Sequence, residues 1–269
     1  MVNTYQKGEL IMKKQIAIAG LLAIILLFSG CVSESPEETT TTITVSAASS
    51  LTDAMNDIAA AFEKDNPNVK VELNYAASGA LRQQIEGGAP VDVFASASQK
   101  HVDLLQGQNL IENASRVTFA KNSLVLIVQA GNPLGIASAD DLTNENVVKV
   151  SIGNPETAPV GRYAKESLET MGLWGNLEGK TVYGENVRQV LTYLETGDVD
   201  AGFVYMTDAK IAKDNTIEVI TTIPTVTEIS YPVCVLKASE HNDEAQMFVN
   251  YLTGETGKQI LTDYGFTAE

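Results

Sequence analysis

The sequence is poor in arginine, cysteine and histidine. It has four arginines among its 269 residues, with two cysteines and two histidines. Acidic residues outnumber basic ones by 34 to 18, so the formal net charge is −16. A chain this acidic is a poor binder of nucleic acid or of anionic lipid headgroups. The few cysteines and histidines leave little for a metal cluster, and an arginine-lined channel for a polyanion is not expected.

The rest of the composition is that of a globular protein. Hydrophobic residues make up 44% of the chain and charged residues 19%, which excludes wholesale disorder. The length suits one large domain or two medium ones.

The N-terminal segment predicts a signal peptide over residues 1–30. Two lysines precede an apolar run of about 13 residues, shorter than the roughly 20 that a bilayer span needs. The run ends in LFSGC, which resembles a lipobox in which Cys31 is lipidated, although Phe28 stands where a smaller aliphatic residue is usual. An uncleaved N-terminal anchor is the alternative. Both interpretations place the protein extracytoplasmically, at the outer face of the cell membrane, and Met12 is a second possible start.

Residues 31–42 predict a flexible tether that begins with the lipidated Cys31. This stretch is rich in Ser, Thr, Glu and Pro and contains almost no apolar residue. The other cysteine, Cys234, lies in the apolar run YPVCVL, and we interpret it as a small buried hydrophobic residue.

From residue 43 onward, apolar strands alternate with amphipathic helices. Leu51, Met55, Ile58 and Phe62, for example, fall on one face of a helix. Such alternation predicts an α/β fold whose mainly parallel sheets are covered by helices on both faces. The strands are expected at residues 43–48, 69–75, 91–96, 123–130, 147–153, 181–184, 201–205, 217–221 and 229–236.

In such sheets, ligands bind beyond the carboxyl ends of the strands, where helices begin. The junctions here contain few Lys or Arg residues, but they offer the hydroxyls of Ser50, Ser78 and Tyr205. The first N–H groups of a helix lack partners within the helix, and the helix dipole adds a partial positive charge. Several converging helix ends would therefore bind a small dianion without a basic side chain.

Each junction residue also has an ordinary structural interpretation. A serine at the start of a helix is usually an N-cap, and Ser50 with Asp53 fits the S-x-x-D capping pattern. A tyrosine at the end of a strand, such as Tyr205, usually serves packing. Periodicity alone supports only a secreted α/β lipoprotein.

The junction sequences resemble the molybdate-binding proteins of ABC transporters, a type II periplasmic-binding-protein family. The similar segments run in family order and cover nearly all of residues 43–267. They are SAASSLTDAMNDIAAAFEK, AASGALRQQIEGGAPVDVFASAS, KNSLVLIV, GNPETAPVGRYAKESLETMGLW, ENVRQVL, GFVYMTDA, YPVCVL and YLTGETGKQILTDYGF.

The resemblance implies two lobes joined by a two-segment hinge, with an oxyanion buried between them. We expect lobe one at residues 43–120 plus 232–269, and lobe two at residues 121–231. Five residues would bind the anion: Ser50 and Ser78 from lobe one, and Val160, Val187 and Tyr205 from lobe two. The serines would use hydroxyl and N–H groups, the valines N–H groups, and the tyrosine its phenol.

The function implied is capture of molybdate, and of tungstate, for delivery to a membrane permease by a monomeric protein without a cofactor. Molybdenum would be held only as the oxyanion, through the same five residues. The family often has alanine where Val160 stands and serine where Gly79 stands. We expect Asp53, Glu156 and Glu185 to point away from the site, so that phosphate is rejected. Binding of sulfate or another small oxyanion is the alternative.

An enzyme is a further alternative, but the sequence offers little chemistry for one. His101 is expected on an exposed helix face and His241 at a polar helix start. No G-x-S-x-G elbow or phosphate-binding P-loop motif is present. A transferase of similar two-lobe fold would need an arginine-rich cleft. A surface lipoprotein without a transport role also remains open.

Overall fold

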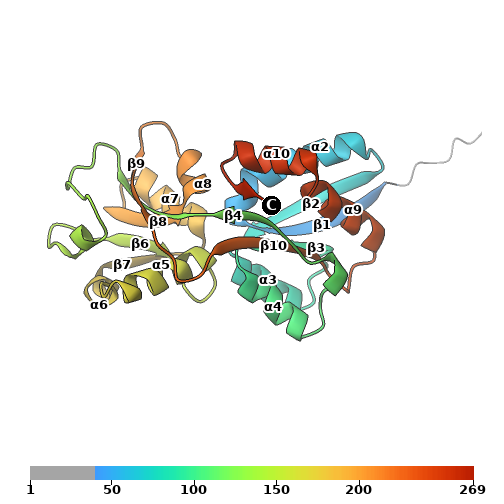
Figure 1. Cartoon of the computed structure of the whole chain (residues 1–269), viewed down its shortest axis with the longest axis horizontal. Coiled ribbons are helices and arrows are strands. Elements are labelled where there is room, and N and C mark those ends of the chain that lie inside the picture. The colour runs from blue at the N-terminus through green and yellow to red at the C-terminus, as the bar shows by residue number, and fades with distance from the viewer. Residues whose placement is uncertain (1–39) are drawn as a thin grey trace, which may run out of the picture. The chain divides into compact units, whose positions relative to one another are not determined.

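The computed structural model describes residues 40–269, which form two β-sheets covered by helices (Figure 1). The predicted signal peptide, Cys31 and most of the predicted tether lie outside the described residues. The first strand begins at Thr41, so the last two residues assigned to the tether belong to the sheet.

The first sheet has six strands in the order β11-β4-β10-β3-β1-β2. Its central strands are short and apolar, and their side chains alternate between the two faces. Val93 and Ala95 of β3 join the larger core, whereas Phe94 between them joins a second, smaller core on the other face. The bounds are β1 Thr41–Ala48, β2 Val69–Ala76, β3 Val93–Ala95, β4 Val117–Asn122, β10 Ile229–Val235 and β11 Thr267–Ala268.

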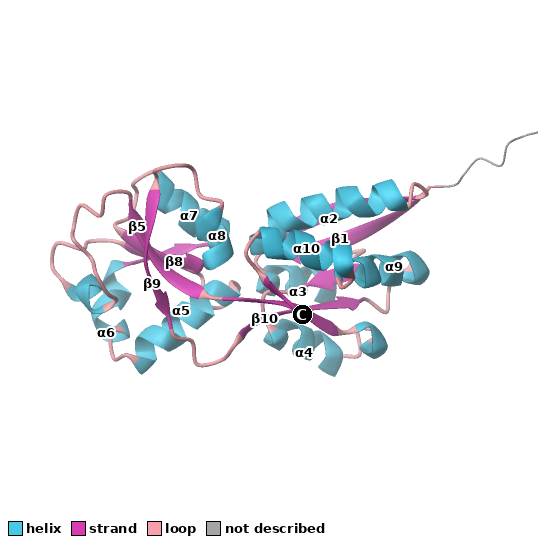
Figure 2. Ribbon diagram, turned by 45° about the horizontal axis from the view of Figure 1, so that its top comes forward, coloured by secondary structure: helices cyan, strands magenta, loops and turns pink. Residues whose placement is uncertain are grey.

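Helices cover both faces of this sheet (Figure 2). Three of them pack together on one face: α2 (Thr52–Asp65), α9 (Asn242–Leu252) and α10 (Glu255–Asp263). The other face carries α3 (Ser78–Glu86) and α4 (Gln99–Gly107), which bury Leu81 and Leu105 against Phe94 and Cys234. Cys234 is therefore a buried hydrophobic residue, as predicted.

The second sheet has five strands in the order β7-β6-β8-β5-β9. Here α7 and α8 pack on one face and α5 and α6 on the other (Figure 2). The bounds are β5 Leu124–Gln129, β6 Val150–Gly153, β7 Thr181–Gly184, β8 Ala201–Tyr205, β9 Ile217–Ile223, α5 Pro159–Thr170, α6 Trp174–Leu177, α7 Val187–Glu195 and α8 Met206–Lys210. Short 3₁₀ turns complete the fold at η2 Ser49–Leu51, η3 Asn113–Ser115, η4 Asp140–Thr143 and η5 Glu178–Lys180.

Two antiparallel chain segments join the sheets. The chain leaves the first sheet at the end of β4 and enters the second at β5, and it returns from β9 to β10. Ser123 and residues 224–228 are the connections between the sheets, so the predicted boundaries at 120/121 and 231/232 fall inside β4 and β10.

The sheets are more mixed than the sequence predicts. Strands β3, β1 and β2 run parallel, as do β7, β6 and β8. The strands that carry the chain between the sheets pair antiparallel to their neighbours, because one segment leaves the first sheet while the other returns to it. The parallel strands end at the edges from which helices begin, and these edges carry the site.

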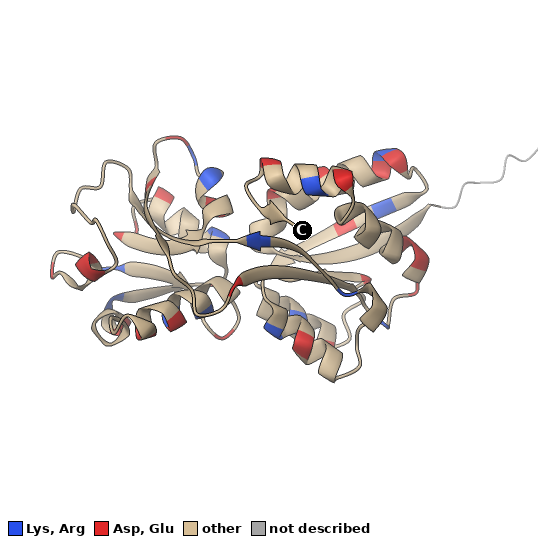
Figure 3. Ribbon diagram, in the orientation of Figure 1, with Lys and Arg blue, Asp and Glu red and all other residues tan. Residues whose placement is uncertain are grey.

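Acidic and basic residues are scattered over both halves of the molecule (Figure 3). Within residues 40–269, no helix has both the length and the apolar character needed to cross a membrane.

One glycine contact is a sharp test of the fold. A Cβ at Gly161 in α5 would lie 1.7 Å from the carbonyl oxygen of Gly153 in β6. We expect Gly161→Ala to force α5 away from the sheet and to lower the free energy of unfolding by about 1–3 kcal/mol or more. Gly175→Ala in α6 is the control, because a Cβ there meets no atom within 4 Å. Equal urea-unfolding midpoints for the two variants would contradict this packing.

Candidate functional site

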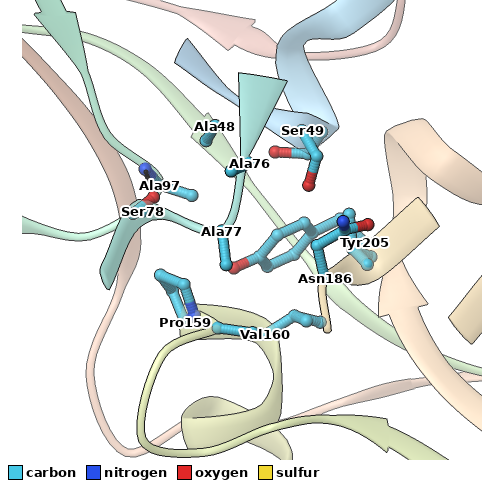
Figure 4. Close-up of a pocket in the computed structure, with 13 residues that line it drawn as sticks. Ala48, Ser49, Ala76, Ala77, Ser78, Ala97, Pro159, Val160, Asn186 and Tyr205 are labelled. Atoms are coloured by element: carbon cyan, nitrogen blue, oxygen red, sulfur yellow. Dashed lines mark hydrogen bonds between the residues drawn. The ribbon is translucent and has the colours of Figure 1, made fainter. Parts of the chain in front are cut away.

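A small pocket lies between the two sheets, where strand ends meet helix starts (Figure 4). It holds about 200 Å³ of space free of protein atoms, part of it open to solvent. All five residues expected from the sequence line it. The lining residues are Ala48, Ser49, Ser50, Ala76, Ala77, Ser78, Ala97, Ala158, Pro159, Val160, Asn186, Val187 and Tyr205.

Helix N-termini from both sheets point at this pocket. Ser78 opens α3, Val160 lies in the first turn of α5 after Pro159, and Val187 opens α7. N–H groups in a first helical turn have no acceptor within the helix, and the described loops and caps supply none to these three. The pocket therefore receives N–H donors and the positive ends of helix dipoles from opposite sides.

The hydroxyl of Ser50 does not cap its helix. The N-cap position of α2 is Leu51, without a side-chain hydrogen bond, so the capping pattern read from Ser50 and Asp53 was wrong. Instead, the Oγ of Ser50 lies 3.0 Å from the phenol oxygen of Tyr231.

A relay of donors orients this pair. The side-chain amide of Asn122 donates to the Tyr231 phenol over 3.2 Å, so the Tyr231 oxygen accepts a hydrogen bond from a residue outside the pocket. The single phenol proton of Tyr231 can then be donated to Ser50, which leaves the Ser50 proton free for the pocket. Burial raises the pKa of Tyr231, so this phenol keeps its proton.

Ser78 is oriented in the same sense by a different partner. The backbone N–H of Ala97 donates to its Oγ over 2.9 Å, and Ser78 makes no capping bond to its own helix. The hydroxyl is fully buried and its acceptor side is satisfied, so its proton is available to a ligand.

Tyr205 supplies a buried phenol without a partner among the described residues. It ends β8, and in Figure 4 its ring extends across the pocket with the hydroxyl toward the side of Ala77 and Pro159. Burial raises the pKa of Tyr205 well above its usual value, so the group is a donor at any physiological pH. A buried phenol without a protein partner can donate to a water molecule or a ligand in the pocket.

A glycine and an asparagine support the backbone of the second half of the pocket. The side chain of Val160 packs over Gly153, where a Cβ would lie 2.8 Å from Val160 Cγ1. The side chain of Asn186 accepts from the N–H groups of Arg188 and Gln189, so it fixes the start of α7 and directs the N–H of Val187.

Among the described residues that line the pocket, none carries a charged side chain. Asp53, Glu156 and Glu185 are not part of the lining, as predicted. Arg188 directly follows the lining residue Val187, and its guanidinium is paired with Asp53 and Asp208, 2.7 Å away in each case.

The sequence interpretation missed several lining residues. Ser49 and Asn186 carry polar side chains, and the remaining residues are alanines and a proline at the same junctions. The asparagine before a helix was a recognisable N-cap signal, whereas the alanines give no signal beyond their position.

His101 is not on an exposed helix face, contrary to the sequence expectation. It is 5% exposed, because α4 packs against α3, where its imidazole lies beside Gly79. A Cβ at Gly79 would lie 2.6 Å from the carbonyl oxygen of Thr157, so the two halves approach closely here.

Comparison with known proteins agrees with this architecture. Residues 43–267 match the model of a family described as bacterial extracellular solute-binding proteins. The chain belongs to this family. Since the family is one of solute-binding proteins, the prediction of a binding protein rather than an enzyme is confirmed.

Individual relatives cover most of the chain. A Bacillus subtilis protein, YvgL, whose name describes an ABC transporter substrate-binding lipoprotein, is 38% identical over 96% of this chain and 99% of its own length. The molybdate-binding protein ModA of Escherichia coli is 38% identical over 84% of this chain and 88% of its own.

The solved structures confirm the two-lobe type II periplasmic-binding-protein fold. The substrate-binding domain from Clostridium difficile, described as part of a molybdenum ABC transporter, is 38% identical with a TM-score of 0.65. The alignment covers 84% of this chain and 98% of that domain. The predicted family resemblance is thereby confirmed.

Proteins of this family bind a solute as their ligand. This agrees with the expectation that the protein binds an oxyanion and has no cofactor. Within residues 40–269, no three His, Cys, Asp or Glu side chains are grouped so that they could hold a metal ion.

His101 gives a pH test of the packing beside the pocket. Burial, followed by the nearby charge of Arg82, lowers the pKa of His101 from 6.5 to about 4. Between these values the unfolded chain takes up a proton that the folded protein does not. The free energy of unfolding should therefore fall as the pH drops from about 6.5 to 4, by roughly 3 kcal/mol.

We expect His101→Gln to lose this part of the pH dependence. Urea unfolding at pH 7.5 and pH 5 measures it in both proteins. The same loss of stability on acidification in the variant as in the wild type would show that His101 is not responsible.

Proposed function

We propose that this protein is an extracytoplasmic substrate-binding lipoprotein that captures molybdate, and also tungstate, and delivers it to an ABC transporter permease. In this proposal the anion is bound by the hydroxyls and N–H groups of Ser50 and Ser78, the N–H groups of Val160 and Val187, and the phenol of Tyr205.

The observation that carries the proposal is a buried pocket that presents hydrogen-bond donors and no charge. The N–H of Ala97 donates to the oxygen of Ser78, Ser50 shares a hydrogen bond with the Tyr231 phenol, and the phenol of Tyr205 is without a partner among the described residues. Such a pocket suits a small anion that accepts hydrogen bonds on every side.

The expected affinity follows from the number of donors. Each charge-assisted hydrogen bond contributes roughly 1.5–3 kcal/mol before entropy costs. Six or seven such bonds leave a net binding free energy of roughly −8 to −12 kcal/mol, which corresponds to micromolar to nanomolar dissociation constants.

No carboxylate lines the pocket among the described residues, which favours anions that carry no proton at neutral pH. Molybdate, tungstate and sulfate are such anions. Phosphate retains a proton much of the time, and that proton would meet no carboxylate to accept it. The names of the E. coli and C. difficile relatives favour molybdate among the candidates.

Delivery to a permease fits the way the pocket is built. Because its donors come from both sheets, a bound anion holds the two halves together, and a closed form that differs from the open form can be recognised by a membrane partner. The relative named as a lipoprotein supports anchoring through Cys31 at the outer face of the membrane. We propose that the protein acts as a monomer.

Isothermal titration with molybdate, tungstate, sulfate and phosphate tests the proposed function. We expect micromolar or tighter binding of molybdate and tungstate, and no measurable binding of phosphate at pH 7. Tighter binding of sulfate than of molybdate would show that sulfate is the preferred ligand, and the proposal of an oxyanion site would stand. Measurable phosphate affinity would contradict the donor-only pocket.

The two serines test the site itself. We expect Ser50→Ala and Ser78→Ala each to raise the dissociation constant for molybdate at least tenfold, because each removes a hydroxyl donor from the anion. Ser138→Ala, outside the pocket, is the control. Circular dichroism should show that all three variants remain folded. Unchanged affinity in both pocket variants would remove these serines from the site.

A further inference from the structure

Arg188 connects the two halves of the molecule beside the pocket. Its Nη2 atom lies 2.7 Å from Oδ2 of Asp53, and its Nε atom lies 2.7 Å from Oδ1 of Asp208. Asp53 is in the first turn of α2, which packs on the first sheet. Arg188 and Asp208 belong to α7 and α8, which pack on the second.

The ion pair of Asp53 and Arg188 lies where the two halves of the molecule meet when the cleft between them is closed. Asp53 follows Ser50 by three residues, and Arg188 directly follows Val187, so the ion pair joins two helix ends that line the pocket. Among the ion pairs of residues 40–269, it is the one that links a helix of the first sheet to a helix of the second.

The second carboxylate holds the guanidinium in place. Asp208 is completely buried, whereas the side chain of Arg188 is 25% exposed and that of Asp53 40%. Because Asp208 already orients Arg188 on its own half, little side-chain entropy is lost when Asp53 approaches from the other half. The three groups together carry one negative charge, so the arginine adds no net positive charge beside the pocket.

Two further contacts cross the cleft at another point. The N–H of Gly79 donates to the carbonyl oxygen of Thr157 over 2.8 Å, and Nη2 of Arg162 donates to Oγ of Ser98 over 3.1 Å. These bonds join α3 and the loop before α4 to the start of α5. The closed arrangement is thus held on both sides of the pocket.

We propose that Asp53 and Arg188 are positioning residues for anion capture. Their ion pair forms as the halves close and holds the starts of α2 and α7 at the spacing at which both donate to one anion. The identity of that anion rests on the proposed function, whereas the role of the ion pair applies to any anion that the pocket binds.

Asp53→Asn tests this role because electrostatics alone predicts the opposite result. Removal of a negative charge beside a dianion site would by itself strengthen anion binding. Loss of the closing contact should instead weaken molybdate binding about fivefold, or about 1 kcal/mol. The affinity of Asp53→Asn should also fall less than that of the wild type when NaCl is raised from 50 to 500 mM.

Asp57→Asn is the matched control on the same helix. It changes the net charge equally, but Asp57 accepts a hydrogen bond from Tyr264 within the first half of the molecule. We expect its molybdate affinity to stay within twofold of the wild type. Thermal unfolding without anion should be the same for Asp53→Asn as for the wild type, which excludes a general loss of stability. Unchanged or tighter binding by Asp53→Asn would overturn the proposal.

Small-angle X-ray scattering separates this proposal from the proposed function. If the wild type binds none of the four anions but is more compact than Asp53→Asn at low salt, only the proposed function fails. If the wild type binds an anion and Asp53→Asn binds it equally well, only the positioning role fails. No binding and no difference in radius of gyration would overturn both.

Discussion

The structure depends on the convergence of uncharged donors from two sheets on one small space. Parallel strands end at a common edge, and the helices that follow them begin there, so each sheet turns several helix N-termini toward the cleft. Neither sheet alone surrounds a ligand. The antiparallel segments that join the sheets bring the two edges face to face, and the pocket exists only where they meet.

The direction of each hydroxyl matters as much as its presence. A serine or tyrosine can donate or accept, and a pocket that offered both would admit protonated anions. The amide N–H of Ala97 donates to Ser78, and the bond from Asn122 to the Tyr231 phenol leaves the phenol proton able to reach Ser50. Under the proposed function, residues behind the pocket would direct these hydroxyls as donors, and selectivity against phosphate would be set one layer away from the ligand.

Sequence periodicity located the junctions but not the partners of the residues within them. The strands β7 and β8 were predicted to the residue, and all five candidate residues line one pocket. The bond from Ser50 to Tyr231 spans 181 residues, and no local pattern encodes a contact of that range. The same reason explains His101: it shares the buried side of α4 with Val102 and Leu105, and that side is covered by the packing of α3 against α4. Strand β4 was missed because its apolar run is short: Val117, Phe119 and Ala120 are followed at once by the polar Lys121 and Asn122.

Arginine is present near the pocket but is kept from acting on the ligand directly. Arg162 is held by Glu166 and lies over the ring of Tyr163, and Arg188 is held by two carboxylates. A free guanidinium would attract any dianion from any direction, because Coulomb attraction is weakly directional compared with a hydrogen bond. Neutralised arginines can instead join elements across the cleft without weakening selectivity. The two proposals together separate two tasks, since dipoles would recognise the anion and paired charges would hold the closed form around it.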